Sequence, residues 1–195
     1  MKKLFLITLL LSVLGADYAY GQIAFERTRI SITGHRLLTG NTILKNWDAS
    51  NGFGLEISAP YVFGNFEAGY RYTRFDEFTY ESSGFHSHYV FAGWNYSYIA
   101  ADDLIFTAGL RLGNNFMLHN QDIIYADEYK FSREESEFSY ELFTRLQLEM
   151  NKNTEFFITT SYNRTIFNIP FAAFYGTIGV TLKFQTPTWL KNFLQ

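Results

Sequence analysis

Three consecutive residues, His86, Ser87 and His88, carry the side chains best suited to chemistry. In an extended segment, side chains two residues apart lie on the same face, so the two imidazoles would offer two nitrogen ligands to a metal ion. A protein zinc site needs a further ligand, which Asp76 or Glu81 in the preceding loop could supply. Two histidines near the outward tip of a strand are more simply explained as solvated loop residues. We therefore keep His86 and His88 as loop candidates and predict neither a metal site nor a cofactor.

A serine flanked by histidines also suggests nucleophilic catalysis. Such catalysis needs a nucleophile, a base and an orienting acid within hydrogen-bond reach of one another. Alternation along an extended segment turns Ser87 and His88 to opposite faces, and no acidic residue occupies a matching position on the face of His88. The sequence therefore predicts no catalytic residue in this segment.

The elements that would position these residues are strands. From about residue 25 onward, apolar and polar residues alternate with a period of two, and turn-forming residues separate the alternating segments. This pattern is typical of strands with two chemically different faces. Eight strands are expected, at about residues 25–37, 53–60, 66–73, 89–98, 104–113, 138–150, 155–163 and 177–184.

The charged residues follow the same alternation. The polar faces carry six positive and five negative side chains, whereas the apolar faces carry charge only at strand ends, as at Arg74. A lipid-facing Arg or Lys costs roughly 2–4 kcal/mol at the bilayer midplane, while opposite charges that are enclosed together can pair. We therefore predict an interior ion-pair network formed by Arg27, Arg29, Glu56, Glu67, Arg71, Arg111, Glu141, Arg145, Glu149, Glu155 and Lys183.

The connections between the strands provide a separate test. Short connections at 61–65, 99–103 and 151–153 alternate with long ones at 38–51, 74–84, 115–136 and 164–173. Outer-membrane barrels alternate short periplasmic turns with longer outward loops and carry aromatic residues at both membrane interfaces. The fold expected for residues 22–184 is all-β, an eight-stranded antiparallel up-and-down transmembrane β-barrel.

The N-terminus predicts export. Two lysines precede an apolar run from Leu4 to Leu14, and Ala19 and Gly21 offer small residues at a cleavage site. This is the pattern of a secretory signal peptide, and the run is shorter than the ~20 residues that a membrane-spanning helix needs. Residues 1–21 are therefore expected to be removed.

The composition excludes several classes of protein. Of the 195 residues, 47% are hydrophobic and 19% are aromatic, which excludes a disordered chain. The absence of cysteine excludes disulfides, thiolate sites and a lipidated N-terminal cysteine. A net charge of -3 provides no basic footprint, so no nucleic-acid partner is expected.

The signal peptide, the eight amphipathic strands and a last strand ending in the segment from Gly179 to Phe184 together resemble the small outer-membrane barrels of the OmpA/OmpX type. The resemblance is architectural, and it implies a location in the outer membrane of a Gram-negative-type bacterium. It also implies contact with outer-membrane lipid and lipopolysaccharide, and recognition of the aromatic-ended last strand by the barrel-assembly machinery during insertion. We expect a monomer.

The C-terminal tail departs from this resemblance. In most members the aromatic residue is the last one, whereas here residues 185–195 follow it. Four apolar residues of the tail could line one side of a short interfacial helix, which would lie against the membrane or cap the barrel mouth. An ordinary frayed tail is the alternative. The four residues are Trp189, Leu190, Phe193 and Leu194.

Three functions remain open. The first is a non-enzymatic outer-membrane protein with a structural, adhesive or interaction role through four outward loops, whose extracellular partner is unknown. An eight-stranded barrel has an interior just filled by side chains, so no open pore is expected. A lipid A-modifying barrel hydrolase is the alternative, because small barrels that deacylate lipid A share this architecture. A soluble lipocalin-like carrier would have the same strand count with its apolar face turned inward.

Overall fold

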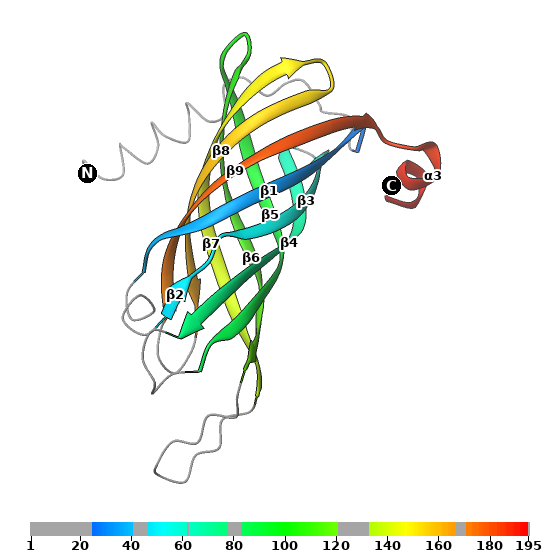
Figure 1. Ribbon diagram of the computed structural model, residues 1–195. Helices are drawn as coiled ribbons and strands as arrows, with labels where there is room; N and C mark the ends of the chain where they lie inside the picture. Colours follow the sequence, from blue (N-terminus) through cyan, green and yellow to red (C-terminus); the bar gives the residue numbers. More distant parts are fainter. Residues whose placement is uncertain are drawn as a thin grey trace, which may run out of the picture.

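Eight long strands form one closed antiparallel sheet (Figure 1). The computed structural model describes residues 25–40, 47–61, 63–77, 83–120, 133–166 and 171–194. Each long strand pairs with the next, and the last pairs with the first, so the sheet has no open edge. The eight-stranded up-and-down barrel predicted from the sequence is confirmed. The strands are β1 (Arg27–Gly40), β3 (Gly52–Tyr61), β4 (Gly64–Glu77), β5 (Phe85–Ala101), β6 (Leu104–His119), β7 (Glu134–Asn151), β8 (Thr154–Thr165) and β9 (Phe171–Gln185).

The side chains alternate between the two faces of the barrel, with the apolar set outside. In β9, Ile178, Val180 and Leu182 are exposed, whereas Thr181 and Lys183 between and beyond them are buried. Period-two alternation produces this arrangement because successive side chains of a strand point to opposite faces. A soluble carrier would turn its apolar side chains inward, so the outward apolar face favours the outer-membrane barrel over the lipocalin-like alternative.

The two ends of the barrel differ. Tight turns join the strands at one end, at Tyr61–Gly64, Ala101–Leu104 and Asn151–Thr154, and the barrel chain also begins and ends there. We call this the turn end, and the opposite end the loop end. The three short connections lie where the sequence predicts them.

At the loop end the connections in the structure are shorter than those predicted from the sequence, because the strands continue farther than expected. β5 and β6 remain paired as far as Phe85↔His119. β8 and β9 remain paired as far as Thr165↔Phe171, which leaves only residues 166–170 between them. Near this end aromatic residues occupy both faces, so the alternation that reveals a strand in the sequence fades before the strand ends.

A short extra strand, β2 (Trp47–Ala49), lies within the first predicted loop. It pairs with β4 through Trp47↔Glu77 and Ala49↔Phe75, beyond the point where β3 stops pairing. The indole Nε1 of Trp47 donates a hydrogen bond to the carbonyl oxygen of Ser83 at 2.9 Å. β2 thus extends the barrel wall and carries an aromatic ring to the mouth of the lumen.

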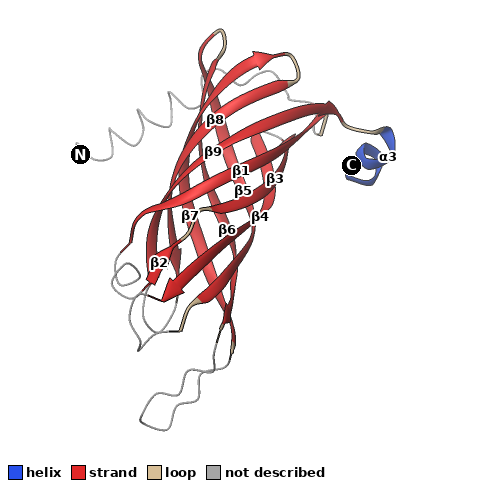
Figure 2. Cartoon of the chain, in the orientation of Figure 1, coloured by secondary structure: helices blue, strands red, loops and turns tan. Residues whose placement is uncertain are grey.

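Beyond β9 the chain forms a short helix, α3 (Thr188–Leu194), drawn in blue in Figure 2. The backbone of the tail is therefore helical over these residues. None of the helices in the described residues combines the length and the apolar character needed to cross a membrane. The predicted signal peptide, residues 1–21, lies outside the described residues.

Candidate functional site

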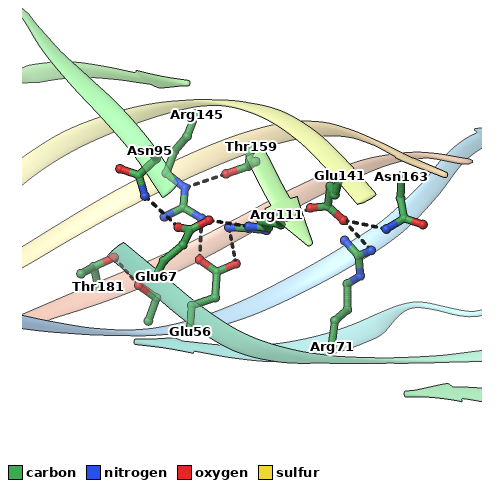
Figure 3. A network of polar contacts seen from close by, with 11 residues as sticks. Glu56, Glu67, Arg71, Asn95, Arg111, Glu141, Arg145, Thr159, Asn163 and Thr181 are labelled. Carbon is green, nitrogen blue, oxygen red and sulfur yellow. Dashed lines mark hydrogen bonds and ion pairs between the residues drawn. The ribbon is translucent and has the colours of Figure 1, made fainter. Parts of the chain in front are cut away.

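The middle of the lumen is organised around the guanidinium of Arg111 (Figure 3). Its Nε lies 2.7 Å from a carboxylate oxygen of Glu67, its Nη1 3.0 Å from Glu141 and its Nη2 3.0 Å from Glu56. The arginine comes from β6 and the carboxylates from β4, β7 and β3, and all four side chains are buried. The rigid fork of guanidinium donors thus connects four strands through one cation.

Two further arginines balance the charge. Arg145 Nη2 lies 2.5 Å from the second carboxylate oxygen of Glu56, and its Nε donates to Thr159 at 2.9 Å. Arg71 Nη2 lies 2.7 Å from Glu141. A buried charge without a partner is expensive, and here three cations face three anions. We call this group the central cluster; its members are Glu56, Glu67, Arg71, Arg111, Glu141 and Arg145.

Aromatic rings stack on the arginines of the central cluster. The Arg111 guanidinium carbon lies 4.5 Å from the ring centre of Phe91 and 4.2 Å from that of Phe143, so the cation lies between two rings. Desolvated cation–π contacts of this kind contribute about 2 kcal/mol each. The same contact recurs for Arg145 with Phe143 and Phe157, and for Arg71 with Tyr89 and Tyr175.

Sequence reasoning did not predict that these interior rings stack on arginines, although a signal for it exists. Three of the phenylalanines interrupt otherwise polar faces, and each faces a glycine on the neighbouring strand. A Cβ atom added to any of these glycines would lie within 2.6 Å of the opposite ring. Glycine therefore lets each ring lie flat against the wall and leaves its other face free for a guanidinium. The pairs are Gly69↔Phe91, Gly109↔Phe143 and Phe157↔Gly179.

Lys183 forms a second ion-pair group nearer the turn end, with Glu149 and Glu155. Its Nζ lies 2.8 Å from Glu155, whose side chain is fully buried, while Glu149 is one-third exposed. The amide of Gln147 also donates to Glu155 at 3.1 Å. A continuous series of hydrogen-bonded side chains joins this group to the central cluster, through Gln147, Thr107, Ser97, Asn65, Asn95 and Glu67.

Two of the eleven predicted network residues belong to neither ion-pair group. Neither Arg27 nor Arg29 forms an ion pair within the part of the chain that the structure describes. Arg29 Nη1 instead donates to the amide oxygen of Asn65 at 3.5 Å, and Arg27 is exposed, lining a pocket of about 310 Å³ at the turn end with Glu149 and Lys183. The prediction fails for these two because water at the mouth solvates a cation as well as a carboxylate does.

Toward the loop end a cluster of apolar side chains lies inside the lumen, and we call it the apolar plug. Phe75 and Phe85 stack with ring centres 4.5 Å apart, and Trp47 meets Phe85 edge-on at 5.5 Å. The plug separates the central cluster from the loop end. Its buried members are Leu37, Phe75, Phe85, Met117, Ala173 and Tyr175.

The structure corrects the placement of His86 and His88, which lie within β5 and not in a loop. Both are half-buried on the outer face, where His86 Nδ1 lies 2.6 Å from the hydroxyl of Tyr72 and His88 Nδ1 lies 2.8 Å from that of Tyr70. The rings also pack against these tyrosines of β4. The pairing of β4 with β5 continues to Phe75↔Phe85, so the segment is strand throughout.

The third ligand considered for a metal is engaged elsewhere. Asp76 forms an exposed ion pair with Arg74 at 2.7 Å, and Glu81 lies outside the described residues. Over the described ranges, no group of three or more histidine, aspartate or glutamate side chains is placed to hold a metal ion.

The residues considered for catalysis are separated by the barrel wall. Ser87 points into the lumen, where it is buried and donates to the side-chain oxygen of Asn115 at 2.7 Å. His86 and His88 lie on the opposite face of the same strand. The hydroxyl and the imidazoles therefore form no nucleophile and base pair.

Comparisons with known proteins bear on the fold. No protein-family model and no curated protein matches the sequence. The solved structure of Neisserial surface protein A is similar, with a TM-score of 0.61 and 17% identity over 84% of this chain and 100% of that one. The N-terminal β-barrel domain of OprF from Pseudomonas aeruginosa is similar with a TM-score of 0.52 and 13% identity, over 83% and 99%. This chain has the fold of the small outer-membrane β-barrels of the OmpA/OmpX type.

The outer-membrane barrel fold explains why the two faces of each strand differ so strongly. In such a barrel the outer face contacts lipid, and every backbone group must be satisfied by strand pairing. The exposed apolar side chains found here are what that environment requires, and the central cluster is enclosed. The lumen is therefore the polar core of the protein, filled from the Lys183 group through the central cluster to the apolar plug.

Proposed function

We propose that the protein is a non-enzymatic, monomeric outer-membrane protein whose filled barrel anchors outward loops that contact a partner. The observation that carries this proposal is the division of the side chains, with charges paired inside and large apolar side chains exposed outside. A water-soluble monomer rarely exposes a contiguous apolar surface of more than a few hundred Å². In this proposal, membrane lipid and lipopolysaccharide surround the outer face of the barrel.

The filled lumen supports an anchoring role over transport. The central cluster occupies the middle of the barrel, and the apolar plug occupies the loop end. In planar lipid bilayers, the purified protein should therefore produce no steady porin-like conductance. Stable channels of porin size would contradict the proposal.

In this proposal the loop end faces outside the cell and the turn end faces the periplasm, as in outer-membrane barrels with short periplasmic turns. Folded barrel extracted from membranes should migrate differently on a gel before and after heating, and protease added to whole cells should cut only the connections at the loop end. Cleavage in the turn at 151–154 from outside would overturn this topology.

The exposed aromatic end of β9, Phe184, fits recognition by the barrel-assembly machinery, and its replacement by serine should slow appearance of the heat-shifted form.

The loops should be separable from the barrel. Replacing residues 121–132 with a short Gly-Ser linker should leave the heat-dependent gel shift unchanged, because every strand pair described above lies outside that segment. Loss of the shift would mean that this connection is part of the barrel core.

The non-enzymatic assignment predicts the same lipid A mass spectrum in cells with and without the protein.

A further inference from the structure

Trp189 in α3 is unusually exposed for a large apolar side chain. Its exposed fraction, 71%, is the highest among the large apolar side chains whose exposure the structure describes, including those on the outer face of the barrel. Its ring makes no aromatic contact and its Nε1 no hydrogen bond with any described residue. Tryptophan is enriched at membrane interfaces because its ring is amphipathic. Among the described residues the side chain therefore has neither an aromatic nor a hydrogen-bonding partner.

The residue that lies two positions before the helix is hydrogen-bonded to the N-terminal end of the barrel chain. Thr186 N donates to the carbonyl oxygen of Glu26 at 3.2 Å, and the hydroxyls of Thr186 and Thr28 lie 2.9 Å apart. Two residues earlier, Phe184 points outward and is half-exposed. Figure 1 shows α3 to the side of the barrel at the turn end, clear of the strands and not across the mouth. The helix thus begins at the height of the last lipid-facing residue.

An aromatic belt marks that height on the neighbouring strands. The ring of Phe25 lies 5.2 Å from that of Tyr61, and Tyr61 and Phe63 lie 5.7 and 5.4 Å from Trp94. Phe25 directly precedes Glu26, whose carbonyl holds Thr186. Aromatic girdles of this kind lie at the membrane interface of outer-membrane barrels. The position of α3 is therefore continuous with an interface that already faces lipid.

We propose that α3 is a membrane-surface anchor that lies on the periplasmic leaflet of the outer membrane, with Trp189 among the lipid headgroups. Lys191, in the last turn, adds a cation of the kind that anionic headgroups attract. Of the two placements that the sequence leaves open, the geometry selects the membrane surface over the barrel mouth.

Single-tryptophan variants test this proposal, because the chain has three tryptophans in three different settings. The test variant, W47F/W94F, retains only Trp189. A variant that retains only Trp94 reports the aromatic belt, and one that retains only Trp47 reports the apolar plug. Each full-length protein is folded into phosphatidylcholine vesicles, and the heat-dependent gel shift confirms the barrel. Emission is then measured with lipids brominated near the headgroup and, separately, with iodide on both sides of the membrane.

The expected result is that Trp189 loses as large a fraction of its emission to the brominated lipid as Trp94 does, and is protected from iodide. Quenching by iodide alone would show a solvated tail and overturn the proposal. Insensitivity to both quenchers would place the helix over the mouth and overturn it equally. If a double variant fails to fold, the loss of lipid quenching on introducing W189F into the otherwise unchanged chain gives the same answer. None of these outcomes depends on the role of the outward loops.

Discussion

The central cluster and the apolar plug fill the same lumen in two different ways. Both are built from inward positions, and β4 and β6 contribute to each, but one consists of paired charges between aromatic rings and the other of packed apolar side chains. In the central cluster each ion pair joins side chains from different strands at one specific register. In the plug, contact depends on volume and shape. The first arrangement constrains register and the second only fills space.

This difference matters because slipping one strand by a single residue reverses its faces. A slip of β6 would move Arg111 out of the lumen and into lipid, and would leave three buried carboxylates facing only two arginines. A buried ion-pair network adds little net stability compared with an apolar core of the same volume, whereas removal of one partner is very costly. The main effect of the central cluster is therefore to destabilise strand pairings that are shifted in register. A lumen filled with apolar side chains would tolerate such shifts.

The largest effect is expected for Arg111→Met. This variant keeps the volume of the side chain but leaves three buried carboxylates without their shared cation, so it should lower the free energy of unfolding by about 3–5 kcal/mol. Urea unfolding in detergent micelles, followed by tryptophan fluorescence, measures the loss. The matched control is Arg74→Met, since Arg74 pairs with Asp76 at side-chain exposures of 55% and 47%; it should change stability by no more than about 1 kcal/mol. Equal losses in the two variants would show that the central cluster is hydrated.

A smaller loss is expected in the plug. Met117→Ala removes a buried side chain and leaves a cavity, and such substitutions cost about 2–5 kcal/mol. The lower half of this range is expected, because the plug borders the loop end and can partly collapse. The control is Met150→Ala, which removes the same atoms from an outer position 64% exposed and creates no cavity. If the two variants were equally stable, the plug would not be packed as the structure shows.

Gly109→Ala tests the fit between the wall and the stacked rings. The added Cβ would lie 2.6 Å from the ring of Phe143, which in turn supports Arg111. Overpacking of this kind costs roughly 1–3 kcal/mol. Gly34→Ala is the control, since nothing lies within 4 Å of its added Cβ. Thermal unfolding should separate the two variants, and a Gly109→Ala protein as stable as the control would contradict the stacked arrangement.

The strands and the sorting of charges could be predicted because alternation is a local property of the sequence. The partners within the lumen could not, because Arg111 meets carboxylates up to 55 residues away along the chain, and register decides which ones. The ends of the strands were missed for a different reason. At His86 and His88 the outer face is polar and the inner face turns apolar, so the alternation no longer indicates which residues are in the strand.

The smallest effect is expected at the turn end, where a charge pair borders water. Glu149→Gln removes the exposed partner of Lys183 but leaves the buried partner Glu155 in place, so the loss should be about 0–1 kcal/mol. It should shrink further in 1 M salt, where the Debye length is about 3 Å. The same substitution at Glu141, which is fully buried between Arg71 and Arg111, should cost several times more and should respond little to salt. Equal salt dependence of the two losses would show that water reaches the middle of the lumen as freely as its mouth, and that the central cluster and the turn end are one environment.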